Sequence, residues 1–352
     1  MVINIFVSGM SKILLFLLLI YLIYLYRATC LEIHPSWIVN APFEFHHSLN
    51  VSLMAEQVPV NESVSGYTAF LDEQLSQVDG FTDGEMVDVV EHFFWGKRGG
   101  LAIELGALDG SSATRSMTFT LENRLGWRRI LIEGNPGYVK ALKMRSPYAL
   151  SVSAAICSTE SKVHFSDAPY VGGIVEFMSP VFLKQYHPII FAAASTGDGK
   201  PMLLQNVSWN SPSIATSVKE IDCIPLSTVL RKAHAKHVNF FILDVEGGEM
   251  EVLKSIDWNY TRFDVLCIET DPGNRPPLFR ENITAILAPH GYTNFTGQKG
   301  RNTWYIHKSF TPSLRPGLDT SCFNGVLKSE WSERWFVNRK TAPFQRCSAS
   351  YS

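Results

Sequence analysis

Residues 101–136, LAIELGALDGSSATRSMTFTLENRLGWRRILIEGNP, constrain the fold more than any other part of the chain. A short apolar run leads into a turn with Gly106 and Gly110, then a helical stretch from about Ser112 and a second apolar run ending at Glu133. Two apolar runs joined through a glycine turn and a helix predict a βαβ unit of a parallel sheet. A plain crossover with a glycine cap explains the same pattern, so a nucleotide pocket and a structural turn both remain open.

The rest of the central region alternates apolar runs with helical spacing. Further strands are expected at Leu150–Cys157, Val163–Phe165, Val238–Val245 and Val265–Ile268, and a closing hairpin at Gly291–Thr296 and Asn302–His307. This alternation predicts an α/β fold: a Rossmann-like, doubly wound sheet of about seven strands whose last hairpin is antiparallel. Residues 179–216 lack a regular period and predict an insertion, either beside the substrate or as a solvated loop.

The spacing of the glycine turn indicates which ligand it suits. It reads Gly-x-x-x-Gly, not the Gly-x-Gly-x-x-Gly of dinucleotide sites. Glu133 can accept the hydroxyls of a ribose, and Glu104 suits a positively charged amino acid end, so the pattern favours S-adenosylmethionine (SAM). The predicted cofactor residues are Glu104, Gly106, Ala107, Gly110, Glu133, Asn135 and Ala155.

Acids at the ends of later strands carry the predicted chemistry. Asp244 and Glu246 follow one buried strand and point to the same side, and Glu269 ends the next. A carboxylate at this edge can accept the proton of a substrate hydroxyl, and Asp244 is the first candidate for that base, ahead of Glu246 and Glu269. Glu249 falls at the start of the following helix and could face the same edge. Helix capping or arginine pairing would explain Glu246 and Glu249 equally well.

Other classes of site find little support. The acids could hold Mg²⁺ or Ca²⁺, but no histidines have zinc spacing, and no required metal is expected. No Gly-x-Ser-x-Gly elbow or Walker loop is present, which argues against a hydrolase or kinase. The net charge of −2 gives no nucleic-acid footprint.

Taken together, these segments make the chain resemble the FkbM family of SAM-dependent methyltransferases. The matching segments are ELGALDG (Glu104–Gly110), ILIEGNP (Ile130–Pro136), AAIC (Ala154–Cys157) and ILDVEGGEMEVL (Ile242–Leu253). The resemblance covers roughly residues 101–307 and implies a Rossmann-like methyltransferase fold. It also implies SAM contacts at Glu104, Gly106, Gly110 and Glu133, with Asp244, Glu246 and Glu249 at the methyl-transfer end. Relatives methylate hydroxyl oxygens of small molecules or sugars.

The predicted organisation has four parts. Residues 1–27 form a membrane anchor or a signal sequence, because residues 13–26 are an unbroken apolar run with interfacial tyrosines. Residues 28–66 form a stem, and residues 67–310 form the methyltransferase domain with the insertion at 179–216. Residues 311–352 form a C-terminal tail.

Glycosylation sequons and cysteines indicate the compartment. Asn-x-Ser/Thr triplets begin at Asn50, Asn61, Asn206, Asn259, Asn282 and Asn294. Together they favour a lumenal body, hence a single-pass type II membrane protein of the endoplasmic reticulum or Golgi, with a secreted protein as the alternative. We expect Cys322 and Cys347 to form a disulfide in the tail, less firmly Cys157 with Cys223, and Cys267 to be a buried thiol. The pairing of Cys30 stays open.

An anchored, glycosylated FkbM domain also resembles the animal Star proteins, which are membrane proteins of the early secretory pathway. Two functions follow. The first is an O-methyltransferase acting on a hydroxyl of a glycan or small molecule. The second is a trafficking factor that binds secreted cargo with weak or no catalysis. Enzyme or not therefore stays open at this stage, with the enzyme favoured because the cofactor residues look intact.

Overall fold

The computed structural model describes residues 36–41, 84–114, 116–195, 204–271, 273–294 and 301–315. Contacts divide the chain into two compact units, Met1–Ile38 and Val39–Ser352. The predicted anchor, most of the stem and the C-terminal tail lie outside the described residues, as do Asn50, Asn61, Cys30, Cys322 and Cys347. Among the described helices, none has the length and apolarity to cross a membrane.

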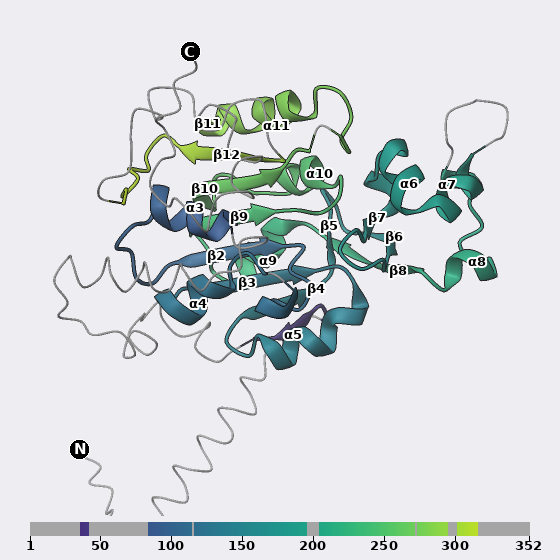
Figure 1. Cartoon of the computed structure of the whole chain (residues 1–352), viewed down its shortest axis with the longest axis horizontal. Helices are drawn as coiled ribbons and strands as arrows, with labels where there is room; N and C mark the ends of the chain where they lie inside the picture. Colours follow the sequence, from purple (N-terminus) through teal and green to yellow (C-terminus); the bar gives the residue numbers. More distant parts are fainter. Residues whose placement is uncertain are drawn as a thin grey trace, which may run out of the picture. The chain divides into compact units, whose positions relative to one another are not determined.

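The main body is a mixed α/β sheet of eight strands in the order β1-β4-β3-β2-β9-β10-β12-β11 (Figure 1). The strands are β1 (Ile38–Asn40), β2 (Leu101–Leu105), β3 (Arg128–Glu133), β4 (Leu150–Ser153), β9 (His237–Leu243), β10 (Arg262–Glu269), β11 (Tyr292–Asn294) and β12 (Asn302–His307). The β4-β3-β2-β9-β10 ladders are parallel, whereas β12 is antiparallel to both β10 and β11. The predicted doubly wound sheet with an antiparallel closing hairpin is confirmed.

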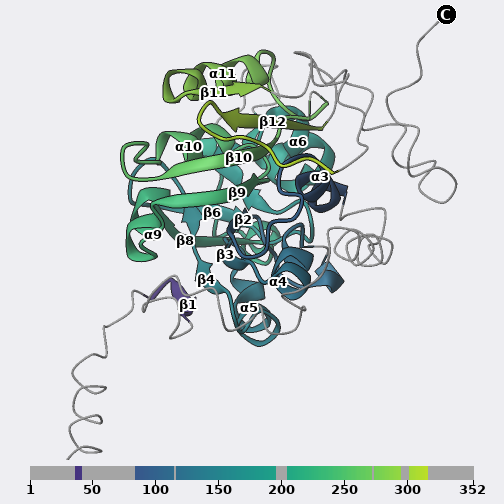
Figure 2. The same ribbon diagram turned by 90° about the vertical axis from the view of Figure 1, so that its left-hand side faces the viewer.

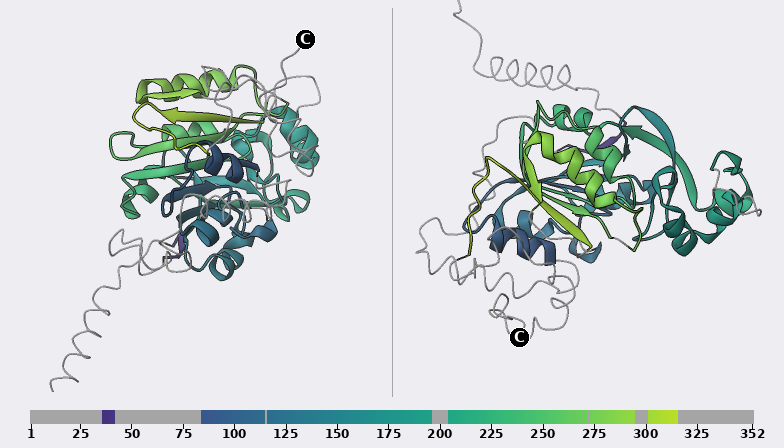
Figure 3. Two further views of the ribbon diagram at one scale, coloured as in Figure 1. Left: turned by 60° about the vertical axis from the view of Figure 1, so that its left-hand side comes forward. Right: turned by 90° about the horizontal axis from the view of Figure 1, so that it is seen from above.

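Helices cover both faces of this sheet. Figures 2 and 3 show α9 (Leu226–Lys232) and α10 (Glu249–Lys254) on one face, and α3 (Gly84–His92) and α4 (Phe119–Leu125) on the other. The remaining helices of the body are α5 (Val139–Arg145) and α11 (Phe279–Leu287), with 3₁₀ turns η4 (Ser112–Thr114), η5 (Pro136–Tyr138) and η8 (Ala288–His290). Because both faces are covered, the central strands β2 and β9 are apolar almost throughout.

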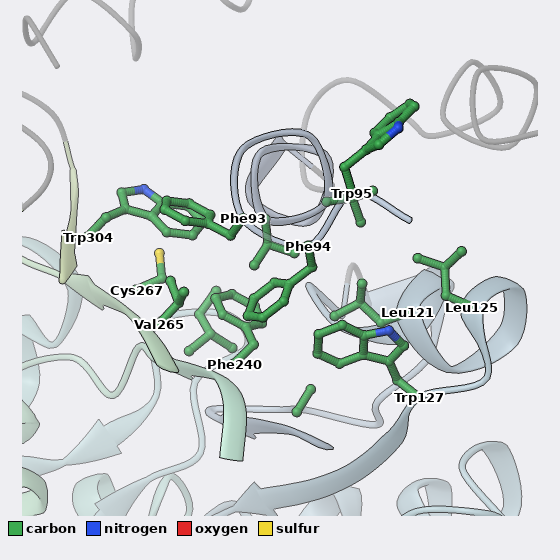
Figure 4. Packing of buried hydrophobic residues seen from close by; sticks show 14 residues of the cluster. Phe93, Phe94, Trp95, Leu121, Leu125, Trp127, Phe240, Val265, Cys267 and Trp304 are labelled. Atoms are coloured by element: carbon green, nitrogen blue, oxygen red, sulfur yellow. The ribbon is translucent and has the colours of Figure 1, made fainter. Parts of the chain in front are cut away.

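The face under α3 and α4 has an aromatic core (Figure 4). The Phe93 ring stacks on Trp304 at 5.4 Å between centroids, and Phe94 meets Trp127 edge to face at 5.2 Å. Phe240 of β9 also stacks on Trp304, at 5.9 Å between centroids. These aromatic contacts pack the segment before β2 against β12 of the closing hairpin. They thereby help to hold the neighbouring strands in place.

A second sheet was not predicted. Its order is β5-β8-β6-β7, with β5 (Ala155–Ile156), β6 (Ser161–Ser166), β7 (Gly173–Ile174) and β8 (Val218–Ile224). The single strand expected at Leu150–Cys157 is therefore wrong, because the chain leaves the large sheet after Ser153 and pairs with β8 from Ala155. Cys157 and Cys223 form a disulfide across this sheet. Cys267 lies buried within β10, as expected.

The insertion is helical, not irregular as predicted. It contains α6 (Pro180–Tyr186), α7 (Pro188–Ala194), η7 (Leu204–Asn206) and α8 (Pro212–Ala215), after η6 (Val175–Phe177), beside the small sheet (Figure 1). Proline begins each of the three α-helices, where its missing N–H costs nothing. Its side chains Phe182 and Ile190 form an apolar core together with Val218 of β8, which local periodicity in such short helices does not reveal.

Candidate functional site

The glycine turn joins the ends of three strands. Gly106 has φ of +90°, and a Cβ there would lie 2.0 Å from the carbonyl oxygen of Asp244. The Gly106 N–H also donates to the Ile132 carbonyl at 3.0 Å. The end of β2 is thus pressed against the loop after β9 on one side and β3 on the other, and only glycine fits there.

The second glycine has a different reason. A Cβ on Gly110 would meet the Leu131 side chain at 2.4 Å and the Ser146 hydroxyl at 2.5 Å. Ala107 packs in the same interior cluster with Leu131 and Leu142. Packing beneath the turn therefore explains why small residues stand at Gly110 and Ala107. The structure gives no further reason to assign either residue to ligand binding.

The predicted helix start at Ser112 is wrong: Ser112–Thr114 is a single 3₁₀ turn and α4 begins at Phe119. Asp109, which is buried, accepts hydrogen bonds from the Ser111 N–H at 2.9 Å, the Ser111 hydroxyl at 2.6 Å and the Thr114 hydroxyl. These short-range hydrogen bonds to one carboxylate hold the backbone in turns, so the helix begins later in the sequence.

Glu104 is buried and bonded within the protein. Its Oε2 accepts the hydroxyls of Ser116 at 2.6 Å and Thr118 at 2.5 Å, and its Oε1 accepts the Met117 N–H at 2.9 Å. Burial raises its pKa, which these three donors oppose. The carboxylate orders the segment between the glycine turn and α4, so in this structure its oxygens serve the protein and not an exposed ligand surface. The predicted contact with the amino acid end of SAM remains untested.

Glu133 ends β3 next to the turn. Its two oxygens accept the backbone N–H of Leu108 at 2.8 Å and of Asn135 at 2.7 Å, and burial raises its pKa to about 7. Each carboxylate oxygen has a second lone pair, so capacity for ribose hydroxyls remains. The Asn135 side chain caps η5 by accepting the Gly137 N–H, and its amide donates to Asp167. Ala155 lies in the small sheet opposite Cys223.

Sequence reasoning missed Arg129, which is fully buried on β3. It donates to the Gly110 carbonyl at 2.8 Å, to the Ser116 hydroxyl at 3.2 Å and to Glu122 at 2.5 Å. Through Ser116 the same network reaches Glu104. Arg129 thus links the Gly110 end of the glycine turn to Ser116 and to α4. Its place at the start of a predicted buried strand was the signal available in sequence.

The acids after β9 and β10 come together as predicted. Within the described residues, one oxygen from each of Asp244, Glu246 and Glu269 lies within 4.8 Å of the others. Glu246 has φ of +58°, an uncommon conformation for a residue with a side chain and one that tends to mark functional sites. Glu249, the first residue of α10, is fully buried beside them. The structure therefore brings together all four acids that the sequence singled out at this edge.

Arg275, in the loop between β10 and α11, supplies positive charge to this cluster. It donates to Glu269, to Glu249 at 2.9 Å and to Glu246 at 3.4 Å. The exposed Arg301 adds a bond to Glu269 at 3.0 Å. Nothing in the sequence distinguished this buried arginine from a surface one.

The four acids of the cluster do not share the nearby positive charge equally. Burial, followed by the charges of Glu269 and Glu246, raises the pKa of Asp244 well above its usual range. Burial and Glu269 raise the pKa of Glu246 to about 8. In the described part of the chain, Asp244 has no ion pair, whereas its three neighbours all bond to Arg275. An acid that resists ionisation at an edge where ligands bind suits proton transfer.

Three carboxylates this close could also hold a hard divalent cation. Arg275 already bonds to Glu246 and Glu269, which would be two of the three ligands. The prediction that no metal is required stays a prediction.

The base of the insertion packs on the same loop. A Cβ on Gly247, which has φ of +117°, would lie 2.5 Å from the Phe177 carbonyl oxygen. The Ser179 hydroxyl, which caps α6, donates to the Asn274 carbonyl at 2.9 Å. The base of the insertion therefore contacts the acid-bearing loops. Of the two alternatives that the sequence left open, a position beside a substrate stays a prediction.

A doubly wound sheet whose strand ends carry a glycine turn and a cluster of acids defines a Rossmann-like class of α/β protein. The chain belongs to the FkbM methyltransferase family: the family model "Methyltransferase FkbM domain" matches residues 104–293, more than half of the sequence. SAM is the usual methyl donor of such a fold and family.

Solved structures with some likeness include two methyltransferases. One is precorrin-6y C5,15-methyltransferase from Geobacter metallireducens, at 10% identity and TM-score 0.24, covering 60% of this chain and 80% of that one. The other is the delta-N METTL16 MTase domain, at 12% identity and TM-score 0.28, covering 70% and 82%. Both TM-scores are too low to carry an inference about this chain. No curated protein matches the sequence significantly.

Proposed function

We propose that the protein is a SAM-dependent O-methyltransferase in which Asp244 takes the proton from an acceptor hydroxyl. The observation that carries this proposal is the cluster at the ends of β9 and β10. Asp244 stands among three acids that all bond to Arg275, and Asp244 alone of the four has no ion pair within the described residues. A carboxylate with a raised pKa is a competent base toward a hydroxyl near neutral pH.

The residues at the glycine turn fit the methyl donor in part. Glu133 keeps acceptor capacity for ribose hydroxyls, and the absence of a side chain at Gly106 brings β2 and β9 close together. Glu104 fits less well, because its oxygens already accept three protein donors. When bound, SAM supplies an activated methyl group. The protein's own task is then to position the acceptor oxygen and receive its proton at Asp244.

A titration of the purified protein with SAM by calorimetry tests the first half of this proposal. We expect saturable binding, weakened by Glu133→Ala, which removes the ribose-type acid. Asp244→Asn tests the second half. It should abolish methyl transfer while leaving SAM affinity nearly unchanged. No heat and no thermal shift with SAM would end the enzyme proposal, and loss of binding in Asp244→Asn would make Asp244 a cofactor residue.

The compartment is part of the proposal. The Cys157–Cys223 disulfide supports an oxidising environment, because such bonds are rare where thiols are kept reduced. Asn259, Asn282 and Asn294 are exposed, as glycosylated residues must be. We infer a single-pass type II membrane protein of the endoplasmic reticulum or Golgi, anchored through residues 13–26, with a secreted form as the alternative. Glycosidase sensitivity tests the lumenal body, and the mass of the mature N-terminus separates anchor from cleaved signal.

A Star-like trafficking factor is the second candidate, and one observation favours it. Several of the exposed large apolar side chains lie on the insertion, among them Val181 at 59%, Ile189 at 56% and Tyr186 at 37% exposure. Exposed apolar side chains of this size are common at protein-binding surfaces. If wild-type protein binds no SAM but retains a secreted protein in co-precipitation, and Val181→Asp with Ile189→Asp releases it, the trafficking function replaces the enzyme.

A further inference from the structure

Arg275 links two parts of the molecule that lie far apart in sequence. It belongs to the loop between β10 and α11, only 7% of its surface is exposed, and it is the buried cation of the acid cluster. The ring of Phe182, on helix α6 of the insertion, lies 6.0 Å from its guanidinium carbon. The ring of Phe279, on α11, lies 5.9 Å away.

On the acid side, Arg275 uses its fork of donors. Nη2 donates to Glu269 and to Glu249 at 2.9 Å, and Nη1 lies 3.4 Å from Glu246. These acids follow two different strands, β9 and β10, and one of them is held in a left-handed conformation. A planar guanidinium can bond to several carboxylates at once, which an ammonium group cannot do with the same geometry.

On the insertion side, the aromatic contact is reinforced nearby. Phe182 is almost fully buried, and it belongs to the apolar core that the insertion forms with η6 and the start of β8. The Ser179 hydroxyl bonds to the Asn274 carbonyl, so the residue before Arg275 holds the start of α6. The insertion is therefore attached at Arg275 and at its immediate neighbour.

We propose that Arg275 is a positioning residue that couples the helical insertion to the acid cluster, so that α6 forms a fixed wall of the acceptor side of the site. The statement that α6 borders the acceptor site rests on the proposed function. The coupling itself is a structural statement that stands or falls separately.

Hydrogen exchange of the full-length protein, read by mass spectrometry, tests the coupling. In Arg275→Met we expect amide exchange in residues 177–191 and 244–249 to rise about tenfold or more, as expected for local opening of one unit. Exchange in β2, β3 and α4 should stay within about twofold of wild type. Arg275→Lys keeps the charge but loses the fork, and should give an intermediate increase in the same two segments.

A matched control is Arg231→Met. Arg231, on α9, also bonds to an acid, Asp257, and lies 4.7 Å from an aromatic ring, that of Tyr260, but both partners belong to the loop between α10 and β10 and not to the insertion. Its exchange in 177–191 should match wild type. Phe182→Leu approaches the coupling from the insertion side. It should reproduce the increase in 244–249 and provides the test if Arg275→Met does not fold.

A uniform rise across the whole body would overturn the proposal. So would an unchanged 177–191 segment in Arg275→Met together with an unchanged 244–249 segment in Phe182→Leu. SAM calorimetry on the same samples keeps the two proposals apart. Failure of the wild-type protein to bind SAM refutes the enzyme, whereas the exchange pattern alone decides the coupling.

Discussion

At the glycine turn, Glu104 accepts three hydrogen bonds and Arg129 pairs with Glu122, whereas after β9 and β10 three of the four acids bond to one buried guanidinium and Asp244 does not. Both regions bury charge against one sheet. The first pairs its acids, Glu104 and Glu122, with nearby donors and with the guanidinium of Arg129. The second leaves like charges facing one another, a cost that stability does not require. The contrast indicates that the glycine-turn region has a structural role and that the acid cluster is the candidate site of chemistry.

The largest expected effect comes from breaking the network of Arg129 beside the glycine turn. Arg129→Met leaves Glu122 buried without its cation and the Gly110 carbonyl without its donor, which should cost about 3–5 kcal/mol of unfolding free energy. Urea unfolding measures it. Arg145→Met is the control, because Arg145 is half-exposed and its partner Asp109 keeps other donors, so its loss should be about 1 kcal/mol or less. Equal losses would show that the buried network is no tighter than a surface pair.

Gly106→Ala attacks the junction between the two regions. Its Cβ would collide with the Asp244 backbone, and Ala at a positive φ adds about 1–2 kcal/mol. With the overpacking, we expect a loss of about 3 kcal/mol. Gly96→Ala has a similar φ of +80° and nothing within 4 Å, so it should lose only the conformational part. Thermal unfolding of the pair compares them, and similar losses would mean that the junction relaxes freely.

Asp244→Asn should stabilise the protein by about 1–2 kcal/mol at pH 8, because it removes a carboxyl group whose ionisation is opposed by desolvation and by the charges of Glu269 and Glu246. The folded pKa of Asp244 lies above its unfolded value, so the wild type loses stability as pH rises between the two. The gain in the variant should therefore disappear near pH 4. Asp264→Asn is the contrast: Asp264 accepts from Asn239 at 2.8 Å and from His237 at 2.8 Å, so this variant should lose stability. Urea unfolding at both pH values measures the two variants, and destabilisation by both would contradict the contrast.

The smallest expected effect concerns Glu133. If its carboxylate accepts ribose hydroxyls, SAM binds the ionised form, and a pKa of about 7 makes affinity rise with pH and level off above that value. The dissociation constant at pH 6 should then be about tenfold larger than at pH 8. Calorimetry at the two values measures it, with Glu133→Gln expected to lose the dependence. A flat profile in the wild type would remove Glu133 from the binding site.

Much of the fold was accessible from sequence. The runs at Leu101–Leu105 and Val238–Val245 predicted β2 and β9 within two residues at each end, because buried parallel strands are continuous apolar segments. The turn-rich residues 179–216 gave no such signal. Their helices are too short to show a period, and only their mutual contacts stabilise them.

The site divides in the same way. The position of acids at strand ends predicted that Asp244, Glu246 and Glu269 would meet, since parallel strands end at one edge. Glu104 and Glu133 were both identified as acids beside the turn. Sequence could not tell that one accepts three protein donors and the other keeps capacity for a ligand, because the donors of Glu104 come from a segment expected to be helix.

The sequence by itself determined the alternation of strands and helices, the edge at which the acids gather and the family to which the chain belongs. These follow from local periodicity and from residue order, which one chain carries in full. The tertiary structure alone decided that Arg129 and Arg275 are buried, which acids they bond to, and that the insertion rests on the second of them. A buried arginine and a surface arginine look alike in sequence, and the partners that make burial affordable lie many residues away.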